Sequence, residues 1–221
     1  MLPSMNILVT GGTGYIGTRL IEALDARGHA VRALVRPSST HRLPAHAVAV
    51  TGNALDAASI AGAAAPGDTL VHLVGTPHPN PAKAAEFERV DLASIRASVA
   101  AATKRHIAHL VYVSVAHPAP AMHAYVAARV AGEAAIVDAG LTATILRPWY
   151  VLGPGHWWPV VLVPFYAIGE ILPPTRESAR RLGLVSVAQM VRALVQAVES
   201  PPPRGTRRIV EVPDIRRAWQ A

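Results

Sequence analysis

Cysteine is absent from the 221 residues, and its absence excludes several classes of protein. A disulfide-linked scaffold, a zinc site built on thiolates and a cysteine nucleophile all require the thiol. The ten histidines do not follow the spacing of metal ligands, so no metal site is expected. The few residues ahead of the first expected strand leave no room for a signal peptide, and we expect a cytoplasmic protein.

A long uninterrupted hydrophobic run is also lacking. The most apolar stretch, residues 157–169, is shorter than the roughly 20 residues that a membrane-spanning helix needs. Pro159 and Pro164 interrupt this stretch, and Glu170 ends it. We therefore expect no transmembrane segment.

Acidic residues are fewer than basic ones, with 14 Asp and Glu against 21 Lys and Arg and a formal net charge of +7. This balance favours anionic partners. The arginines are dispersed and no aromatic residues are interleaved with them, so nucleic-acid binding is not expected. A cofactor that carries several phosphates would account for part of the positive charge.

Segments typical of strands alternate with segments typical of helices along the whole chain. This pattern predicts an α/β fold, a single-domain Rossmann-like doubly wound parallel sheet over residues 1–221. The pattern is lost between residues 149 and 183, which we interpret as a small irregular C-terminal substrate lobe inserted beside the carboxyl ends of the strands. Strands are expected at residues 5–10, 30–35, 47–51, 69–74, 109–115, 142–147, 184–187 and 208–212, and the longer helices at 82–103, at 123–138 and up to 199.

The end of the first expected strand carries glycines at three-residue spacing, and a helical pattern follows. In a strand–turn–helix unit that binds a dinucleotide, the first glycine permits a sharp turn, the second lets the backbone approach the pyrophosphate, and the third lets the helix pack on the strand. The helix N-terminus offers unpaired N–H groups and a positive dipole end to the anion. We therefore assign cofactor binding to Gly11, Thr13, Gly14, Tyr15, Ile16 and Gly17.

The residue that ends the second strand of such a fold faces the adenosine ribose, and here it is Arg36. An acidic side chain at this point binds a free 2′-hydroxyl, whereas an arginine accepts a 2′-phosphate. The sequence therefore favours NADP(H) over NAD(H). Asn53, after the third expected strand, is placed to hydrogen-bond the adenine edge, and an ordinary turn asparagine is the alternative.

With these residues in view, the chain resembles the atypical branch of the short-chain dehydrogenase/reductase superfamily, with its NmrA-like and NAD-dependent-epimerase-like proteins. The segment Thr-Gly-Gly-Thr-Gly-Tyr-Ile-Gly at residues 10–17 is similar to the glycine motif of that branch. The turn Val74-Gly75-Thr76 is similar to the loop that passes over the nicotinamide ribose, and the segment that contains Pro148 is similar to the Arg-Pro segment beside the nicotinamide. Residues 112–115 resemble the strand that ends in the active-site serine, and residues 125–129 stand where the family has Tyr-x-x-x-Lys.

The resemblance implies three catalytic residues, Tyr125, Arg129 and Ser114. In the family the tyrosine exchanges a proton with the reacting oxygen, the lysine holds the ribose and favours the phenolate, and the serine orients the carbonyl. This chain departs from the pattern because Arg129 replaces the lysine, which keeps the positive charge but changes the donor geometry. The alternative is a partly buried helix tyrosine followed by a surface arginine.

Three histidines are alternative proton carriers. His72 falls within a central expected strand and reads as a packed core residue, whereas His117 and His123 flank the loop that leads to Tyr125.

The expected lobe holds Trp157, Trp158, Phe165 and Tyr166 among mainly apolar residues. Such a lining favours a small apolar carbonyl or quinone-like substrate, and it suits a dimer interface or contact with a membrane surface equally well. The leading hypothesis is therefore an NADP(H)-dependent oxidoreductase. A non-catalytic NADPH-binding sensor or respiratory-complex accessory protein and an epimerase or isomerase are the alternatives.

Overall fold

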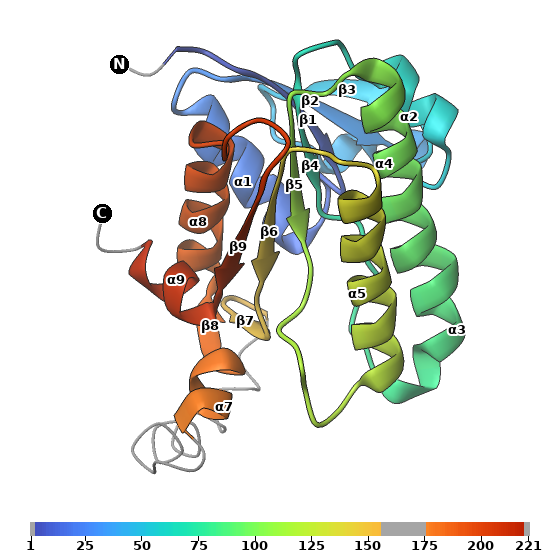
Figure 1. Cartoon of the computed structure of the whole chain (residues 1–221). Coiled ribbons are helices and arrows are strands. Elements are labelled where there is room, and N and C mark those ends of the chain that lie inside the picture. The colour runs from blue at the N-terminus through green and yellow to red at the C-terminus, as the bar shows by residue number, and fades with distance from the viewer. Residues whose placement is uncertain (1–2, 156–175, 219–221) are drawn as a thin grey trace.

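In the computed structural model of the chain, residues 3–155 and 176–218 are described, and within them seven strands form one parallel sheet in the order β3-β2-β1-β4-β5-β6-β9 (Figure 1). Two short strands, β7 and β8, pair with each other in a second sheet. The strands of the large sheet are β1 Asn6–Thr10, β2 Ala30–Val35, β3 Val48–Thr51, β4 Thr69–His72, β5 His109–Val113, β6 Ala143–Arg147 and β9 Arg207–Glu211. The small sheet consists of β7 Tyr150–Leu152 and β8 Leu184–Ser186.

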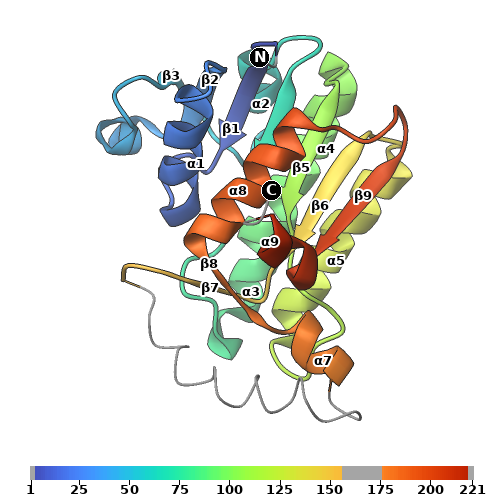
Figure 2. The same ribbon diagram turned by 90° about the vertical axis from the view of Figure 1, so that its left-hand side faces the viewer.

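Helices cover both faces of the large sheet. On one face, which Figure 2 views from the front, lie α1 (Tyr15–Asp25), α8 (Val187–Glu199) and α9 (Val212–Arg217). On the other lie α2 (Ala57–Ala63), α4 (Ala93–Arg105) and α5 (His123–Asp138), as Figure 1 shows. The remaining short helical elements are η1 Pro37–Arg42, η2 Pro81–Lys83, α3 Ala84–Glu86, η3 Phe87–Leu92 and α7 Arg176–Arg181.

The five inner strands of the large sheet are buried on both faces because their apolar side chains alternate between two cores, whereas the edge strands β3 and β9 are largely exposed. Ile7 and Val9 of β1 pack in the core that contains α1 and α8, whereas Leu8 between them packs in the core that contains α2, α4 and α5. This two-sided burial explains why the inner strands read as nearly continuous apolar runs. The predicted doubly wound parallel fold is confirmed.

Because the strands are parallel, their carboxyl-terminal ends all lie at the same edge of the sheet. We call the edge formed by the last residues of the strands the carboxyl edge; in Figure 1 it lies at the bottom, where β7, β8 and α7 are also found. The strand order reverses between β1 and β4, which pair with each other. From β1 the sheet continues through β2 to β3, and from β4 it continues in the opposite direction through β5 and β6 to β9. Open α/β sheets bind ligands at such a reversal, just outside the carboxyl ends.

Three details differ from the sequence prediction. The helix predicted at 82–103 is divided into η2, α3, a π-helical segment (η3) and α4. The strand predicted at 184–187 pairs with β7 and is not part of the large sheet, because it crosses over the carboxyl edge. The predicted substrate lobe has regular structure at its described ends, β7 and α7, whereas residues 156–175, with all four of its named aromatic residues, lie outside the described residues.

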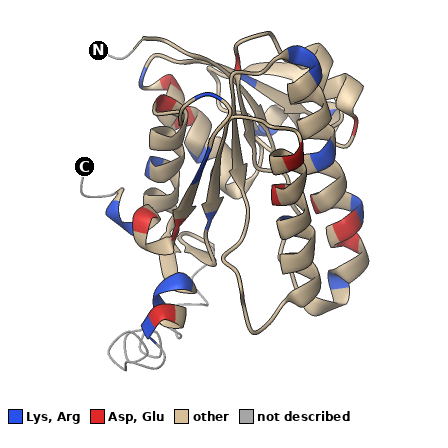
Figure 3. Cartoon of the chain, viewed as in Figure 1, with Lys and Arg blue, Asp and Glu red and all other residues tan. Residues whose placement is uncertain are grey.

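None of the helices within the described ranges is long and apolar enough to cross a membrane. Basic residues are spread over several elements, and α7 carries charges of both signs (Figure 3).

Candidate functional site

The glycine turn after β1 has the geometry that the sequence predicts. Gly11 has φ +79°, a conformation that L side chains rarely adopt, and its carbonyl accepts a hydrogen bond from the Gly14 N–H at 3.0 Å. A Cβ atom on Gly17 would lie 2.8 Å from the Gly12 Cα and still closer to the Gly11 carbonyl oxygen. The first turn of α1 can therefore pack against the loop only because residue 17 is glycine.

The start of α1 is suited to an anion. Gly14 caps the helix without a side-chain hydrogen bond, and the first turn contains no acidic residue. Its backbone N–H groups are therefore not satisfied by a capping side chain, and the helix dipole adds a positive field. These residues fit the pyrophosphate of a dinucleotide.

Arg36 and Asn53 lie at the carboxyl ends of the two outer strands on that side. Arg36 is exposed and immediately precedes η1. Asn53 is exposed as well, and its Oδ1 accepts a hydrogen bond from the Leu55 N–H at 3.0 Å, as a turn asparagine does.

The loop of Val74, Gly75 and Thr76 follows β4 at the carboxyl edge and is held by a buried carboxylate, Asp91. Oδ2 of Asp91 accepts hydrogen bonds from the Thr76 N–H at 3.0 Å and from the Thr76 hydroxyl at 2.6 Å. Its Oδ1 accepts a hydrogen bond from Arg129 Nη2 at 2.6 Å. Asp91 is fully buried and belongs to the π-helical segment η3, a distortion of helices that is frequent at functional sites.

Sequence analysis missed Asp91. A signal existed, because Asp91 lies four residues from both Phe87 and Ile95 and so shares a helical face with two large apolar residues. A carboxylate on such a face needs a buried partner.

Arg129 supplies this partner, and the alternative of a surface arginine is wrong. Arg129 is 5% exposed, and its Nη1 donates to the Val113 carbonyl at 2.9 Å. Burial by itself lowers the pKa of Arg129, but Tyr125, Tyr112 and Asp91 together raise the pKa above its usual value, so the guanidinium stays charged. The guanidinium also fills the space in which a Cβ on Gly75 would lie, which explains the glycine there.

Tyr125 lies on the same face of α5 one turn earlier. Its ring centroid is 5.2 Å from the Arg129 guanidinium carbon and 5.1 Å from the Phe87 ring. Nε of Arg129 is buried and has no hydrogen-bond partner among the described residues. A charged donor with an unused N–H beside the 74–76 loop fits the polar groups of a cofactor.

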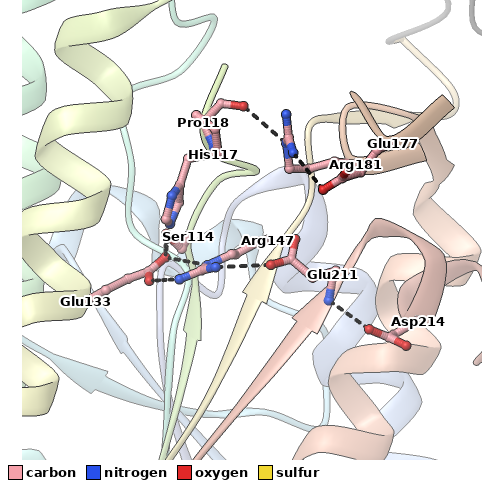
Figure 4. A network of polar contacts seen from close by, with 9 residues as sticks. All are labelled: Ser114, His117, Pro118, Glu133, Arg147, Glu177, Arg181, Glu211 and Asp214. Atoms are coloured by element: carbon pink, nitrogen blue, oxygen red, sulfur yellow. Dashed lines mark hydrogen bonds and ion pairs between the residues drawn. The ribbon is translucent and has the colours of Figure 1, made fainter. Parts of the chain in front are cut away.

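Ser114 belongs to a second polar network, built on Glu133 of α5 (Figure 4). The Ser114 hydroxyl donates to Glu133 Oε1 at 2.5 Å, and Arg147 donates to both oxygens of Glu133 at 3.0 and 2.5 Å. Arg147 also donates to Glu211 at 3.0 Å. Burial lowers the pKa of Arg147, but its bonds to the two carboxylates raise it overall. The ends of β5, β6 and β9 are thereby joined at the carboxyl edge.

Glu133 and Glu211 are further residues that sequence reasoning missed. Both belong to segments read correctly as helix or strand, but nothing local to them indicates that they share an arginine 14 and 64 residues away. Pro148, which follows Arg147, is buried, and its carbonyl accepts from the Ala116 N–H at 2.9 Å.

The three candidate histidines differ in their surroundings. His72 is a packed core residue, as predicted: Nδ1 lies 3.1 Å from the Thr10 hydroxyl and 2.9 Å from the Ser98 hydroxyl. Burial, with a smaller effect of Arg129, lowers the pKa of His72 to about 3. His123 is exposed at the first turn of α5, whereas His117 faces Glu133. In the described ranges no three His, Asp or Glu residues are arranged to hold a metal ion.

The model of the NAD(P)H-binding family matches residues 11–154. A ceramide reductase of Caulobacter vibrioides is 27% identical over 96% of this chain and 65% of its own length. A 4-hydroxy-2-methyl-3-oxo-4-farnesyl-3,4-dihydroquinoline-1-oxide ketoreductase of Stigmatella aurantiaca is 30% identical over 67% of this chain and 51% of its own length. The chain therefore spans less than two thirds of the length of these relatives.

A solved structure shares the fold. The enzyme WbmH of Bordetella bronchiseptica, determined in complex with NAD+, superimposes with a TM-score of 0.68 over 90% of this chain and 73% of its own, at 22% identity. The glycine turn at the switch point, the parallel seven-stranded sheet and the family match agree, and the chain belongs to the NAD(P)H-binding family.

Proposed function

We propose that the protein is a cytoplasmic NADPH-dependent reductase of a small apolar carbonyl or quinone-like compound. The observation that carries the proposal is the position of Tyr125 beside a buried, charged arginine that keeps one donor unused, next to the loop that follows β4. The names of two relatives, a ceramide reductase and a farnesylated quinoline-oxide ketoreductase, support reduction and an apolar substrate.

The cofactor would be held by groups already described. The N-terminus of α1 would bind the pyrophosphate, Arg36 the 2′-phosphate, and Arg129 Nε a polar group near the nicotinamide. When bound, NADPH supplies the hydride. The role of this chain is to orient the two reactants and to supply a proton.

Tyr125 is the proposed proton donor. A tyrosine that gives up its proton leaves a phenolate, which a fixed positive charge stabilises. The Arg129 guanidinium is held over the Tyr125 ring because Asp91 and the Val113 carbonyl fix two of its nitrogens. Arg129 thereby keeps the electrostatic part of the role that the resemblance gives to a lysine.

The first test of this function is NADPH oxidation, followed by absorbance, in the presence of long-chain ketones and quinones. We expect consumption by the wild-type protein and a loss of turnover of about 10²–10⁴-fold in Tyr125→Phe, the range for removal of a general acid. NADPH affinity should change little, because the ring that packs on Phe87 is kept. Turnover that is unchanged in Tyr125→Phe would contradict the proton-donor role.

Cofactor choice is tested separately at Arg36. We expect Arg36→Ala to weaken NADPH binding by about 10–100-fold, as for loss of a charge-assisted hydrogen bond, with NADH affinity nearly unchanged. Fluorescence titration with both cofactors measures this. Arg42→Ala, an exposed arginine at the far end of η1, is the matched control. An equal loss for both cofactors would contradict a 2′-phosphate contact.

A second candidate is a NADPH-binding sensor without catalysis. It is favoured by the hydrogen bond that commits the Ser114 hydroxyl to Glu133, since a serine that orients a substrate needs a free donor. The titration together with the absorbance assay of NADPH oxidation separates the candidates, because a sensor binds NADPH and never consumes it. An epimerase would use bound cofactor and convert substrate without net oxidation.

A further inference from the structure

Four buried polar side chains lie together at the switch point between β1 and β4, and the proposed chemistry does not use them. They are the hydroxyls of Thr10, Ser94 and Ser98 and the imidazole of His72, all fully buried. Nδ1 of the imidazole lies 3.1 Å from the Thr10 hydroxyl and 2.9 Å from the Ser98 hydroxyl. Its Nε2 lies 3.3 Å from the Ser94 hydroxyl. Polar groups are costly to bury unless they are hydrogen-bonded, so the position of each proton matters.

The partners of Ser94 decide which nitrogen of His72 carries the proton. The Ser94 hydroxyl donates to the backbone carbonyl of Asp91 at 3.1 Å. A hydroxyl has one proton, so while Ser94 makes this bond it can only accept from His72. Burial lowers the pKa of His72 to about 3, so the imidazole is neutral and has a single N–H. That N–H is therefore on Nε2, and Nδ1 is left to accept from Thr10 and Ser98.

The network connects the two loops to which the proposed function assigns the cofactor. At one end Thr10 immediately precedes the glycine turn, and its carbonyl accepts from the Leu73 N–H at 3.0 Å. At the other end is Asp91, whose carboxylate holds Thr76 and Arg129. His72 and Ser94 are the links between these ends.

The Asp91 carbonyl to which Ser94 donates belongs to the π-helical segment η3. The wide turn of η3 is closed by a hydrogen bond from the Ala93 N–H to the Glu88 carbonyl, five residues earlier. A return to α-helical geometry would remove one residue from this turn and rotate η3 relative to α4 by roughly 100°. The Asp91 carboxylate would then turn away from Thr76 and Arg129. A hydrogen bond to the backbone of Asp91 itself opposes this rotation.

We propose that His72 and Ser94 are positioning residues for the cofactor site, because together they hold η3 in the π-helical geometry that directs Asp91 to Thr76 and Arg129. The 74–76 loop and Arg129 Nε are thereby in place before the cofactor arrives. The effect on cofactor binding rests on the proposed function, whereas the effect on the 74–76 loop does not.

Ser94→Ala and Ser98→Ala form a matched pair for testing this role. Both serines are fully buried on α4 one turn apart, and both bond to His72, but only Ser94 bonds to Asp91. We expect Ser94→Ala to weaken NADPH binding about 10-fold, as for loss of one buried hydrogen bond. Ser98→Ala should change the affinity by less than about 2-fold. Fluorescence titration measures both.

Amide hydrogen exchange at Thr76 gives a readout that needs no cofactor. The Thr76 N–H donates to the Asp91 carboxylate, so its exchange reports whether this carboxylate is in place. The buried Leu110 N–H of β5, which donates to the Thr142 carbonyl, reports opening of the whole fold. Relative to Leu110, exchange at Thr76 should be about 10-fold faster in Ser94→Ala and within about 2-fold of wild type in Ser98→Ala.

The wild-type imidazole provides a test that needs no substitution. Long-range proton–nitrogen NMR correlations distinguish the two neutral tautomers of a histidine, and we expect His72 to carry its proton on Nε2. A proton on Nδ1 would overturn the proposal. Ser94 would then give its one proton to Nε2, and the Asp91 carbonyl would have no donor from this network.

Weaker NADPH binding and faster Thr76 exchange in Ser94→Ala but not in Ser98→Ala support the proposal. Equal effects of the two substitutions would reduce the network to core packing and overturn it, as would an unchanged Ser94→Ala. If Ser94→Ala does not fold, the tautomer of His72 in the wild type decides. A wild-type protein that binds neither NADPH nor NADH would overturn the proposed function, and exchange at Thr76 would still decide whether Ser94 holds the loop.

Discussion

Replacement of Asp91 by alanine is expected to lower the free energy of unfolding by about 3–5 kcal/mol, the usual cost of removing one partner from a buried ion pair. The Asp91 side chain is fully buried and that of Arg129 is 7% exposed. Without the carboxylate, the Arg129 guanidinium would remain charged in an apolar setting, and the Thr76 N–H and hydroxyl would lose their acceptor. Chemical denaturation followed by circular dichroism measures the loss.

A double substitution tests whether the uncompensated charge is the cause. Asp91→Leu combined with Arg129→Met removes both charges, and we expect it to be more stable than Asp91→Ala alone. Asp25→Ala, at the exposed end of α1, is the control and should change stability by about 0.5 kcal/mol or less. If Asp91→Ala were as stable as this control, the ion pair would not hold the loop.

Lowering the pH is expected to destabilise the protein at pH values well above those at which carboxylates titrate. The reason is that two buried histidines are neutral in the folded protein. Burial lowers the pKa of His72 to about 3 and that of His109 to about 4, from an ordinary value of 6.5. Arg129 and Arg208, respectively, add to these shifts. Below pH 6.5 the unfolded chain binds protons that the folded chain excludes.

The stability that these groups contribute is therefore complete above pH 6.5 and is lost as the pH falls toward 4 for His109 and toward 3 for His72. Each histidine adds about 1.4 kcal/mol per pH unit to the loss, so that the free energy of unfolding at pH 4.5 is expected to be about 5 kcal/mol lower than at pH 7.5.

The slope of stability against pH, measured by denaturation between pH 7.5 and 4.5, is the quantity to compare among variants. His72→Gln and His109→Gln should each reduce the slope by about 1.4 kcal/mol per pH unit, whatever they do to stability at pH 7.5. His46→Gln, at an exposed position, should leave it unchanged. A wild-type slope already as shallow as that of His72→Gln would contradict a neutral buried imidazole.

Local sequence signals predicted the parts of the fold that local chemistry determines. The spacing of Gly11, Gly14 and Gly17 predicts the turn, because Gly11 has a positive φ and Gly17 leaves no room for a Cβ atom. An aspartate is a preferred helix cap, and the Asp56 side chain, ahead of α2, accepts from the N–H groups of Ala58 and Ser59. Glycine is the preferred residue just beyond a helix, and Gly140, which follows α5, has φ +64°.

The missed features depend on partners that are distant in the sequence. Arg129 is buried because Asp91, 38 residues earlier, lies opposite it. The alanine-rich sequence of α5 has little contrast between its faces, so it does not indicate that Arg129 and Glu133 point inward. The π-helical segment that brings Asp91 to the loop has no local sequence signal, and this is why the sequence predicted one continuous helix at 82–103.

The parallel pairing of the large sheet has a consequence for how the chain folds. Neighbouring parallel strands cannot form as hairpins, because each must be joined to the next by a crossover, and β6 and β9 meet across some sixty residues. High contact order of this kind slows folding, since loop closure precedes most of the stabilising contacts. The carboxyl edge gathers residues from the ends of all seven of these strands, so we expect it to be assembled late and cooperatively, and partly folded chains to lack the site altogether.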